Sequence, residues 1–191
     1  MKEEIRRRVL EQRNNMLQEE VKSKSKQIQD RFFESLYYQS SRTIMTYVDF
    51  QNEVETKNII SRALDEGKII AVPLCGPNVS LVPVKIQSLD DLESGTKGIL
   101  EPKKIDIIDV KRLDLVLMPG VAFDRNCNRV GYGLAYYDRF LTQLSPSTMI
   151  IALAYSFQVV EFLPVEEHDQ KVNLIVTEDE IIRCQDNGKM V

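Results

Sequence analysis

The segment "RNCNRVGYGLAYYDRF", residues 125–140, combines residue types that suit the binding of a phosphate. It follows the apolar stretch "LDLVLMPG" (113–120), and its glycines would let the backbone approach an anion without an intervening side chain. We expect a helix to begin near Gly133, so that its free amide groups and positive dipole end face the anion. Arg129 can add charge-assisted hydrogen bonds. The segment therefore predicts a phosphate site, although a plain tight turn would explain the glycine spacing about as well.

Asp138 lies one turn into this expected helix. A carboxylate beside bound phosphates would repel them unless a cation lay between. Mg²⁺ commonly binds one or two carboxylates together with phosphate oxygens, so the position predicts a magnesium ligand. The alternative is that Asp138 pairs only with Arg139 or Arg129 at the surface.

Residues 3–22 predict a helix in which cations project from within an apolar stripe, at about 100° per residue. The cations are Lys2, Arg6 and Arg13, and the stripe consists of Ile5, Val9, Leu10, Met16 and Leu17. In one interpretation the long side chains lie on the core and extend their charged ends to water. In the other, the helix directs cations at a phosphate-bearing ligand, because an unpaired charge beside apolar side chains is costly. The helix alone does not distinguish the two.

Length and charge narrow the class of protein. A chain of 191 residues, 43% of them hydrophobic, suits one compact domain over residues 1–191. Its 25 basic and 29 acidic residues give a net charge of −4, so we expect neither a nucleic acid nor a membrane as partner. "MKEEIRRRVL" does not resemble a secretion signal, and we expect a cytoplasmic protein.

The cysteines are few and widely spaced: Cys75, Cys127 and Cys184. They follow no metal-ligand spacing and are typical of free thiols in a reducing compartment. We therefore predict neither a disulfide nor a zinc site.

Further along the chain, helical and apolar extended segments alternate, which is typical of an α/β fold. Helices are expected at 26–38 and 53–68, strands at 42–48, 69–74, 113–120, 148–155 and 173–177, an extra strand or hairpin at 79–86, and a long loop at 94–104. The alternation predicts a mostly parallel, Rossmann-like sheet with helices on both faces. In such sheets, ligands bind beyond the carboxyl ends of the strands.

Several segments together resemble the 5-formyltetrahydrofolate cyclo-ligase (5,10-methenyltetrahydrofolate synthetase) family. The longest is "MPGVAFDRNCNRVGYGLAYYDRFL" (118–141), which is similar to the family signature PG-aF---G-RLGyG-GyYDr-L. The other segments are the spaced Lys2, Arg6 and Arg13, "EVETKNII" (53–60), "GKIIAVP" (67–73), "GTKGILEP" (95–102) and "PVEEHDQKVNLIVTED" (164–179). They occur in the family's order along nearly the whole chain.

The resemblance implies an enzyme that uses ATP and Mg²⁺ to convert 5-formyltetrahydrofolate into 5,10-methenyltetrahydrofolate. Carried over by position, the implied ATP-binding residues are Lys2, Arg6, Arg129, Val130, Gly131, Tyr132, Gly133 and Tyr137. The implied substrate-binding residues are Val48, Phe50, Glu53, Leu81, Tyr132, Gly133, Leu134, Ala135 and Tyr136. The implied catalytic residues are Arg129, Tyr136 and Tyr137, and the implied magnesium ligands are Asp138 and Asp169. We expect a monomer or a weak homo-oligomer.

Some positions depart from the family pattern. Cys127 stands where the family usually has glycine, and Leu134 with Ala135 replaces a glycine-containing pair. Ala135 would fit a helical backbone but not a left-handed one. These departures leave open a second function, a protein that binds reduced folate without turnover. A cysteine nucleophile, Cys127 with His168, is a weaker alternative.

Overall fold

The computed structural model describes residues 1–76, 80–95, 98–133, 135–166 and 169–184. The helices are α1 (Lys2–Asn14), α2 (Gln18–Phe33), α3 (Leu36–Ser40), α4 (Lys57–Asp65) and α5 (Tyr136–Leu141). The strands are β1 (Thr43–Thr46), β2 (Ile69–Gly76), β3 (Ser80–Ile86), β4 (Leu92–Ser94), β5 (Leu100–Pro102), β6 (Leu115–Met118), β7 (Ala122–Asp124), β8 (Arg129–Val130), β9 (Met149–Leu153), β10 (Val159–Val160), β11 (Leu174–Val176) and β12 (Ile181–Arg183). Leu134 and His168, which the sequence singles out, lie outside the described residues.

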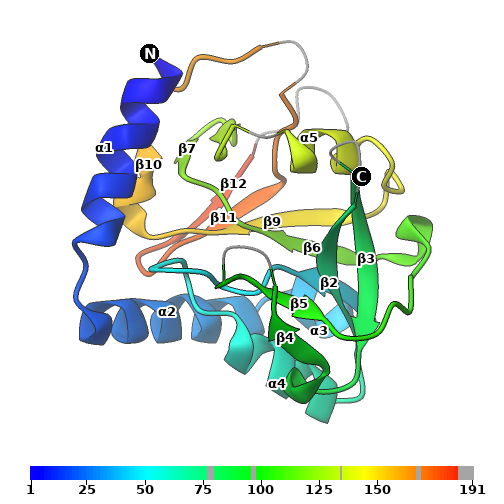
Figure 1. The fold of residues 1–191 in the computed structure, drawn as a ribbon. Coiled ribbons are helices and arrows are strands. Elements are labelled where there is room, and N and C mark those ends of the chain that lie inside the picture. The colour runs from blue at the N-terminus through cyan, green and yellow to red at the C-terminus, as the bar shows by residue number, and fades with distance from the viewer. Residues whose placement is uncertain (77–79, 96–97, 134, 167–168, 185–191) are drawn as a thin grey trace.

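A seven-stranded sheet forms the centre of the fold, with strand order β12-β11-β9-β6-β1-β2-β3 (Figure 1). The five inner strands are parallel to one another, and β3 and β12 add to the edges in antiparallel fashion. The inner strands are short apolar runs because both of their faces are covered. The predicted mostly parallel sheet is confirmed.

Helices cover both faces of this sheet, as predicted. In Figure 1, α2, α3 and α4 lie below the sheet and α5 lies above it. Successive strand residues alternate between the two layers: Ile44 packs with the α2–α4 layer, and Met45 packs with the α5 layer. This period of two follows from the pleat of a β-strand.

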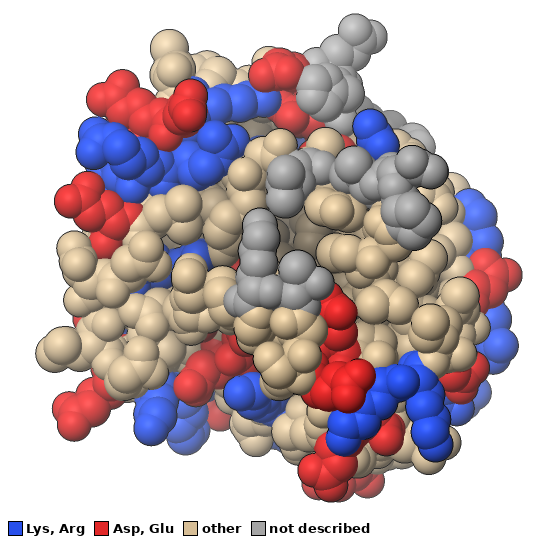
Figure 2. All heavy atoms as spheres, viewed as in Figure 1, with Lys and Arg blue, Asp and Glu red and all other residues tan. Residues whose placement is uncertain are grey.

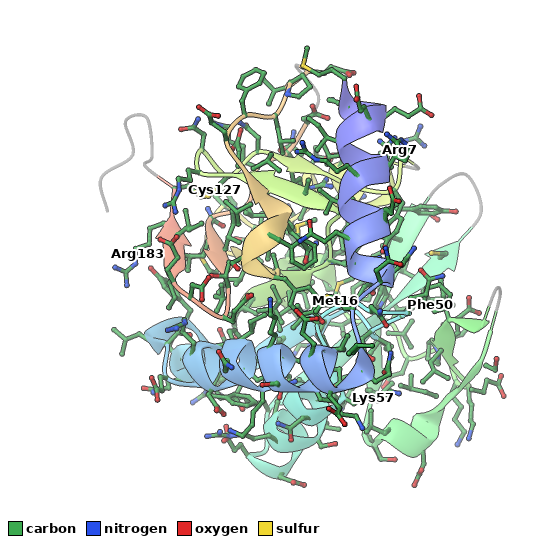
Figure 3. All side chains as sticks on the ribbon, turned by 90° about the vertical axis from the view of Figure 1, so that its left-hand side faces the viewer. Arg7, Met16, Phe50, Lys57, Cys127 and Arg183 are labelled. Atoms are coloured by element: carbon green, nitrogen blue, oxygen red, sulfur yellow. A yellow bond between two sulfur atoms is a disulfide. The ribbon has the colours of Figure 1, made fainter. Side chains whose placement is uncertain are left out.

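The expected single helix over 3–22 is instead two helices. α1 ends at Asn14, and α2 begins at Gln18 in a different direction, with Met16 at the turn between them (Figure 3). α1 packs through Val9 against Val121, Ala122 and Val130. Leu17, which was expected in the apolar stripe, is 74% exposed because the helix has already ended.

Two helix starts and one expected loop also differ from the predictions. The helix expected over 53–68 begins at Lys57, because the backbone N–H and hydroxyl of Thr56 bind the Asp49 carboxylate and close residues 49–56 into a loop. The expected loop 94–104 contains β5, which pairs with β4. α5 begins at Tyr136 and not near Gly133.

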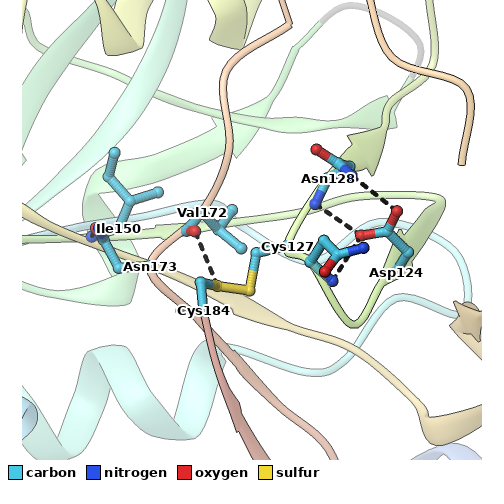
Figure 4. The surroundings of a disulfide bond; sticks show 8 residues. Asp124, Cys127, Asn128, Ile150, Val172, Asn173 and Cys184 are labelled. Atoms are coloured by element: carbon cyan, nitrogen blue, oxygen red, sulfur yellow. Dashed lines mark hydrogen bonds between the residues drawn. A yellow bond between two sulfur atoms is a disulfide. The ribbon is translucent and has the colours of Figure 1, made fainter. Parts of the chain in front are cut away.

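Cys127 and Cys184 form a disulfide, so the prediction of free thiols is wrong for this pair (Figure 4). Their separation of 57 positions gave no sign of contact, but the fold places the two Cα atoms 5.7 Å apart. That separation is within the normal range for a disulfide. Cys75 is a free cysteine at the surface, in agreement with the prediction. The bond ties the loop after β7 to the end of β12.

We predict that this disulfide stabilises the fold. A cross-link that closes a loop of this length should contribute about 2–4 kcal/mol to the free energy of unfolding. Urea unfolding with and without a thiol reductant should show that loss, and Cys184→Ser should show it without reductant. Cys75→Ser is the control and should leave the unfolding midpoint unchanged. Equal midpoints for oxidised and reduced protein would contradict the prediction.

Candidate active site

The strand order places a ligand crevice between β1 and β6. From β1 the chain turns to β2 on one side, and from β6 it continues to β9 on the other, so the order reverses between these two neighbours. Ligands of open α/β sheets bind at such a reversal, beyond the carboxyl ends of the strands. The loop 47–56 follows β1, and the loop 119–135 that contains β7 and β8 follows β6. Figure 2 shows a hollow in the middle of one face, between α5 and the β4–β5 hairpin, and the described residues on its rim are mostly uncharged.

Two cations near the start of α1, Lys2 and Arg6, contact other segments of the protein and do not extend into bulk water. Lys2 Nζ lies 2.6 Å from Asp169 Oδ2 and 2.9 Å from Glu166 Oε1. Burial lowers the pKa of Lys2, but hydrogen bonds to the two carboxylates outweigh it, and the pKa is raised. Arg6 Nε donates to the carbonyl oxygen of Gly131 over 2.8 Å. α1 therefore brings Arg6 to the glycine loop, residues 129–133, and Lys2 to the segment that contains Glu166 and Asp169.

Asp124 shapes the turn that precedes the glycine loop. Its fully buried carboxylate accepts hydrogen bonds from the backbone N–H groups of Asn126 and Asn128 and from the Asn128 side chain, over 2.8–3.0 Å (Figure 4). Cys127, inside this turn, has a left-handed backbone with φ of 60°. The resembled family usually has glycine at this position. The left-handed backbone explains that preference, because this conformation is costly for residues other than glycine.

Arg129 and Asp138 form a partly buried ion pair between β8 and α5, in which Arg129 is the buried partner. Asp138 Oδ1 also accepts from the backbone N–H of Gln170 over 3.2 Å, so Asp138 and the neighbouring Asp169 lie at one corner of the site. Burial lowers the pKa of Arg129, although Asp138 opposes the shift. Arg129 Nε is buried and has no hydrogen-bond partner among the described residues. The pairing of Asp138 with Arg129 is thus present, but inside the site and not at the surface.

The backbone between Gly131 and α5 is left-handed at two places. Gly133 has φ of 94°, and a side-chain carbon built there would lie 3.6 Å from Arg6 Nη2. Ala135 has φ of 54° and caps α5, so the helical backbone that would suit alanine is not formed. The glycine-containing pair that the resembled family usually has at positions 134 and 135 fits this conformation better than alanine does.

Glu53, Tyr132 and Arg13 form a third group at the other end of α1. The Tyr132 hydroxyl donates to Glu53 Oε1 over 2.7 Å and accepts from Arg13 Nη2. Arg13 is 1% exposed and Glu53 is 7% exposed. Burial raises the pKa of Glu53, while the Tyr132 hydrogen bond and the charge of Arg13 limit that rise. Glu53 lies in the loop after β1 and not at the start of the helix that was expected over 53–68.

The remaining predicted residues divide between core and surface. Val48 and Leu81 are buried in the two main core clusters. Phe50 is partly exposed, and its ring lies about 4 Å from the position of a carbon built on Gly98. Tyr136 and Tyr137 are partly buried against the α5 layer. Within the described ranges, no group of three or more His, Cys, Asp and Glu side chains is arranged to hold a metal ion.

Asn52 is a structural residue of the site that the sequence analysis did not identify. Its buried side-chain amide donates to the carbonyl oxygens of Arg13 (2.9 Å) and Met16 (3.1 Å), and its oxygen accepts from Gln18 (2.9 Å). These contacts end α1, begin α2 and fix both to the loop that contains Glu53. The only hint in the sequence was the position of Asn52 next to Glu53. The hydrogen-bond partners of Asn52 lie more than 30 positions away along the chain, so the sequence did not reveal its role.

Comparison with known proteins adds independent information. Residues 1–178 match the family model described as "5-formyltetrahydrofolate cyclo-ligase family". The chain is 33% identical over 156 residues to a mouse 5-formyltetrahydrofolate cyclo-ligase, covering 74% of this chain and 76% of that protein. It is 30% identical over 197 residues to a probable enzyme of that name from Caenorhabditis elegans, covering 95% of each chain.

Solved structures also resemble the fold. An Aquifex aeolicus 5,10-methenyltetrahydrofolate synthetase superposes with a TM-score of 0.87 at 29% identity, covering 100% of this chain and 96% of that one. A Mycoplasma pneumoniae protein of the same name has a TM-score of 0.77 at 23% identity, covering 93% and 98%, and supports the fold alone. None of the helices in the described ranges has the length and apolarity needed to cross a membrane.

We predict that Asn52 anchors α1 in place. Asn52→Ala leaves buried carbonyl groups without donors and should lower the free energy of unfolding by about 2–3 kcal/mol. Urea unfolding would measure the loss, and amide hydrogen exchange should become faster in the last turn of α1. Asn58→Ala, at an exposed position with one side-chain hydrogen bond, is the control and should change stability by less than about 0.5 kcal/mol. Equal losses for the two variants would contradict this role.

Proposed function

Because the chain belongs to the 5-formyltetrahydrofolate cyclo-ligase family, we propose that it converts 5-formyltetrahydrofolate and ATP into 5,10-methenyltetrahydrofolate, ADP and phosphate. The observation that carries the proposal is the convergence of two charged groups along α1. Near its start, Lys2 and Arg6 meet the glycine loop and Asp169, and near its end Arg13 meets Tyr132 and Glu53. One end suits a triphosphate and the other a pterin.

The triphosphate would bind along the loop 129–133. Lys2, Arg6 and Arg129 supply positive charge, while Gly131 and Gly133 leave the backbone open to phosphate oxygens. The buried Arg129 Nε, which has no partner among the described residues, is an available donor. Val130, Tyr132 and Tyr137 would border the nucleotide. Each of these cations already faces a carboxylate or carbonyl in the structure, so ATP would share or replace these contacts.

The charges of the site fit a requirement for Mg²⁺. Lys2, Arg129 and Arg6 are nearly balanced by Glu166, Asp169 and Asp138, so a bound triphosphate would add uncompensated negative charge. Asp138 and Asp169 lie at one corner and would hold the ion together with phosphate oxygens, the ligand set that Mg²⁺ prefers. When bound, the ion would neutralise charge on the phosphates.

The pterin would lie beside Glu53. A carboxylate accepts two parallel N–H donors, and the aminopyrimidine edge of a pterin presents such a pair. Phe50 and Tyr132 are partly exposed next to this group and could contact the ring faces. The backbone of Gly133 and Ala135 and the ring of Tyr136 would border the formyl group, whereas the buried Val48 and Leu81 would support the pocket from the core.

The proposed chemistry is one phosphoryl transfer followed by one ring closure. The formyl oxygen attacks the γ-phosphorus of ATP, and ADP leaves. N10 of the folate then attacks the activated formyl carbon and loses its proton to water, and the carbon–oxygen bond breaks to release phosphate. Arg129 would stabilise charge on the transferred phosphoryl group, and Tyr136 and Tyr137 would shield the reacting atoms from water.

The test is the absorbance of the methenyl product, followed with purified protein, 5-formyltetrahydrofolate, Mg²⁺ and ATP. We expect product only when both ATP and Mg²⁺ are present, with one ADP formed per turnover. Omission of ATP and addition of a chelator are the controls. The strained backbone at Cys127 and Ala135 keeps the alternative, folate binding without turnover, in view. Tight folate binding with no ATP-dependent product would support that alternative and refute the proposal.

We predict that Gly133 is needed for ATP binding. Gly133→Ala adds a methyl group beside the Arg6 guanidinium in a left-handed backbone and should raise the KM for ATP at least fivefold. Gly67→Ala is the matched control, because Gly67 is also left-handed (φ 77°) and no described residue would meet its methyl group. Both variants should lose about 1–2 kcal/mol of stability. A similar rise in the KM for ATP in both would contradict the placement of ATP.

A further inference from the structure

Arg13 differs from Lys2 and Arg6, the other two α1 cations of the candidate site, in its environment. Lys2 and Arg6 meet a carboxylate and a backbone carbonyl near the start of the helix, and Arg13 lies about 10 Å beyond Arg6 along the helix axis. Its side chain is 1% exposed, which is rare for a guanidinium. Its Nε atom has no hydrogen-bond partner among the described residues. A buried cation with incomplete hydrogen bonding has a considerable energetic cost.

The charge that compensates Arg13 is the Glu53 carboxylate. The nearest nitrogen–oxygen distance between them is 4.0 Å, and the Tyr132 hydroxyl connects them by accepting from Arg13 and donating to Glu53. The second carboxylate oxygen of Glu53 accepts from the backbone N–H of Phe50 over 3.0 Å. Arg13 therefore acts on Glu53 partly by charge and partly through the tyrosine.

We infer that Arg13 is a positioning residue for the folate: it holds Glu53, through Tyr132, in the orientation and the ionised form that a pterin needs. The inference deepens the proposed function and rests on it, because a protonated Glu53 could not accept both donors of the aminopyrimidine edge. Arg13 itself does not contact the ring.

Among the described residues that face Glu53, Arg13 is the cation that can keep it ionised. They are Arg13 from α1, Asp49 and Tyr47 from the segment after β1, Tyr132 from the glycine loop, Tyr137 from α5, and Tyr155, whose hydroxyl donates to the Glu53 backbone. The tyrosines are neutral near pH 7, since burial raises the pKa of each. Asp49 raises the pKa of Glu53, and Arg13 lowers it.

We therefore predict a changed pH dependence when Arg13 is neutralised. In Arg13→Gln the pKa of Glu53 rises further, so the carboxylate is protonated at a higher pH than in the wild-type protein. Well below the pKa the ionised fraction falls tenfold for each pH unit, so the rise in the KM for 5-formyltetrahydrofolate at low pH should begin at a higher pH in Arg13→Gln, and the KM should recover as the pH increases. The KM for ATP should change less than about threefold, because the glycine loop keeps Lys2 and Arg6. Arg13→Lys should restore part of the wild-type pH profile.

Arg7→Gln is the matched control, because Arg7 is on the same helix but exposed, paired with Glu11 at 3.7 Å (Figure 3). It should leave the pH profile of the folate KM unchanged. If Arg13→Gln does not fold, Tyr132→Phe tests the same link, since it removes a hydrogen bond that lowers the pKa of Glu53 and so should shift the profile in the same direction.

A carbon-13 NMR titration of Glu53, assigned with Glu53→Gln in ligand-free protein, gives a readout that needs no activity. An upward shift of the Glu53 titration in Arg13→Gln, together with the altered folate KM, supports the inference. An unchanged titration and an unchanged KM profile in both Arg13→Gln and Tyr132→Phe would overturn it while leaving the proposed function intact. Absence of ATP-dependent product in the wild-type protein would instead overturn the proposed function.

Discussion

The docking of α1 through its charged face is the interaction on which the candidate site depends. Lys2 binds Asp169, Arg6 binds the Gly131 carbonyl and Arg13 binds Tyr132, so one helix joins the segments that follow two different strands, β8 and β10. Apolar contact through Val9 holds the helix against the protein, but the polar contacts determine its register. A shift of α1 by a single residue would rotate its cations by about 100° away from these partners. The geometry of both ends of the site thus depends on one helix.

The site places charged groups where they are poorly solvated, and this has a cost for stability. Arg13, Glu53 and Arg129 are all buried, and the Nε atoms of both arginines have no partners in the described part of the chain. Replacement of buried ion pairs by apolar residues often stabilises proteins, so such groups are rarely explained by stability. A preformed set of donors instead avoids reorganisation when a charged ligand binds, which is the usual advantage of a polar active site.

Local patterns predicted much of the fold. Apolar runs ended by Pro119 and Gly120 or by polar residues predicted the inner strands, whereas the cations within the apolar stripe of α1 left open whether that helix faces a ligand or only the core. What the sequence did not reveal depends on distant partners. α1 ends at Asn14 because of Asn52, α4 begins late because of Asp49, and the disulfide joins residues 57 positions apart. Propensity describes neighbours along the chain, and these boundaries are set by tertiary contacts.

The order of these contacts along the chain affects how the protein is made. Lys2 leaves the ribosome 167 positions ahead of its partner Asp169. At translation rates of about 5–20 residues per second, α1 is exposed for roughly ten seconds or more before its last partner is available. The candidate site therefore stays incomplete until Asp169 has emerged. Final assembly is a long-range closure, which is slow compared with local helix formation.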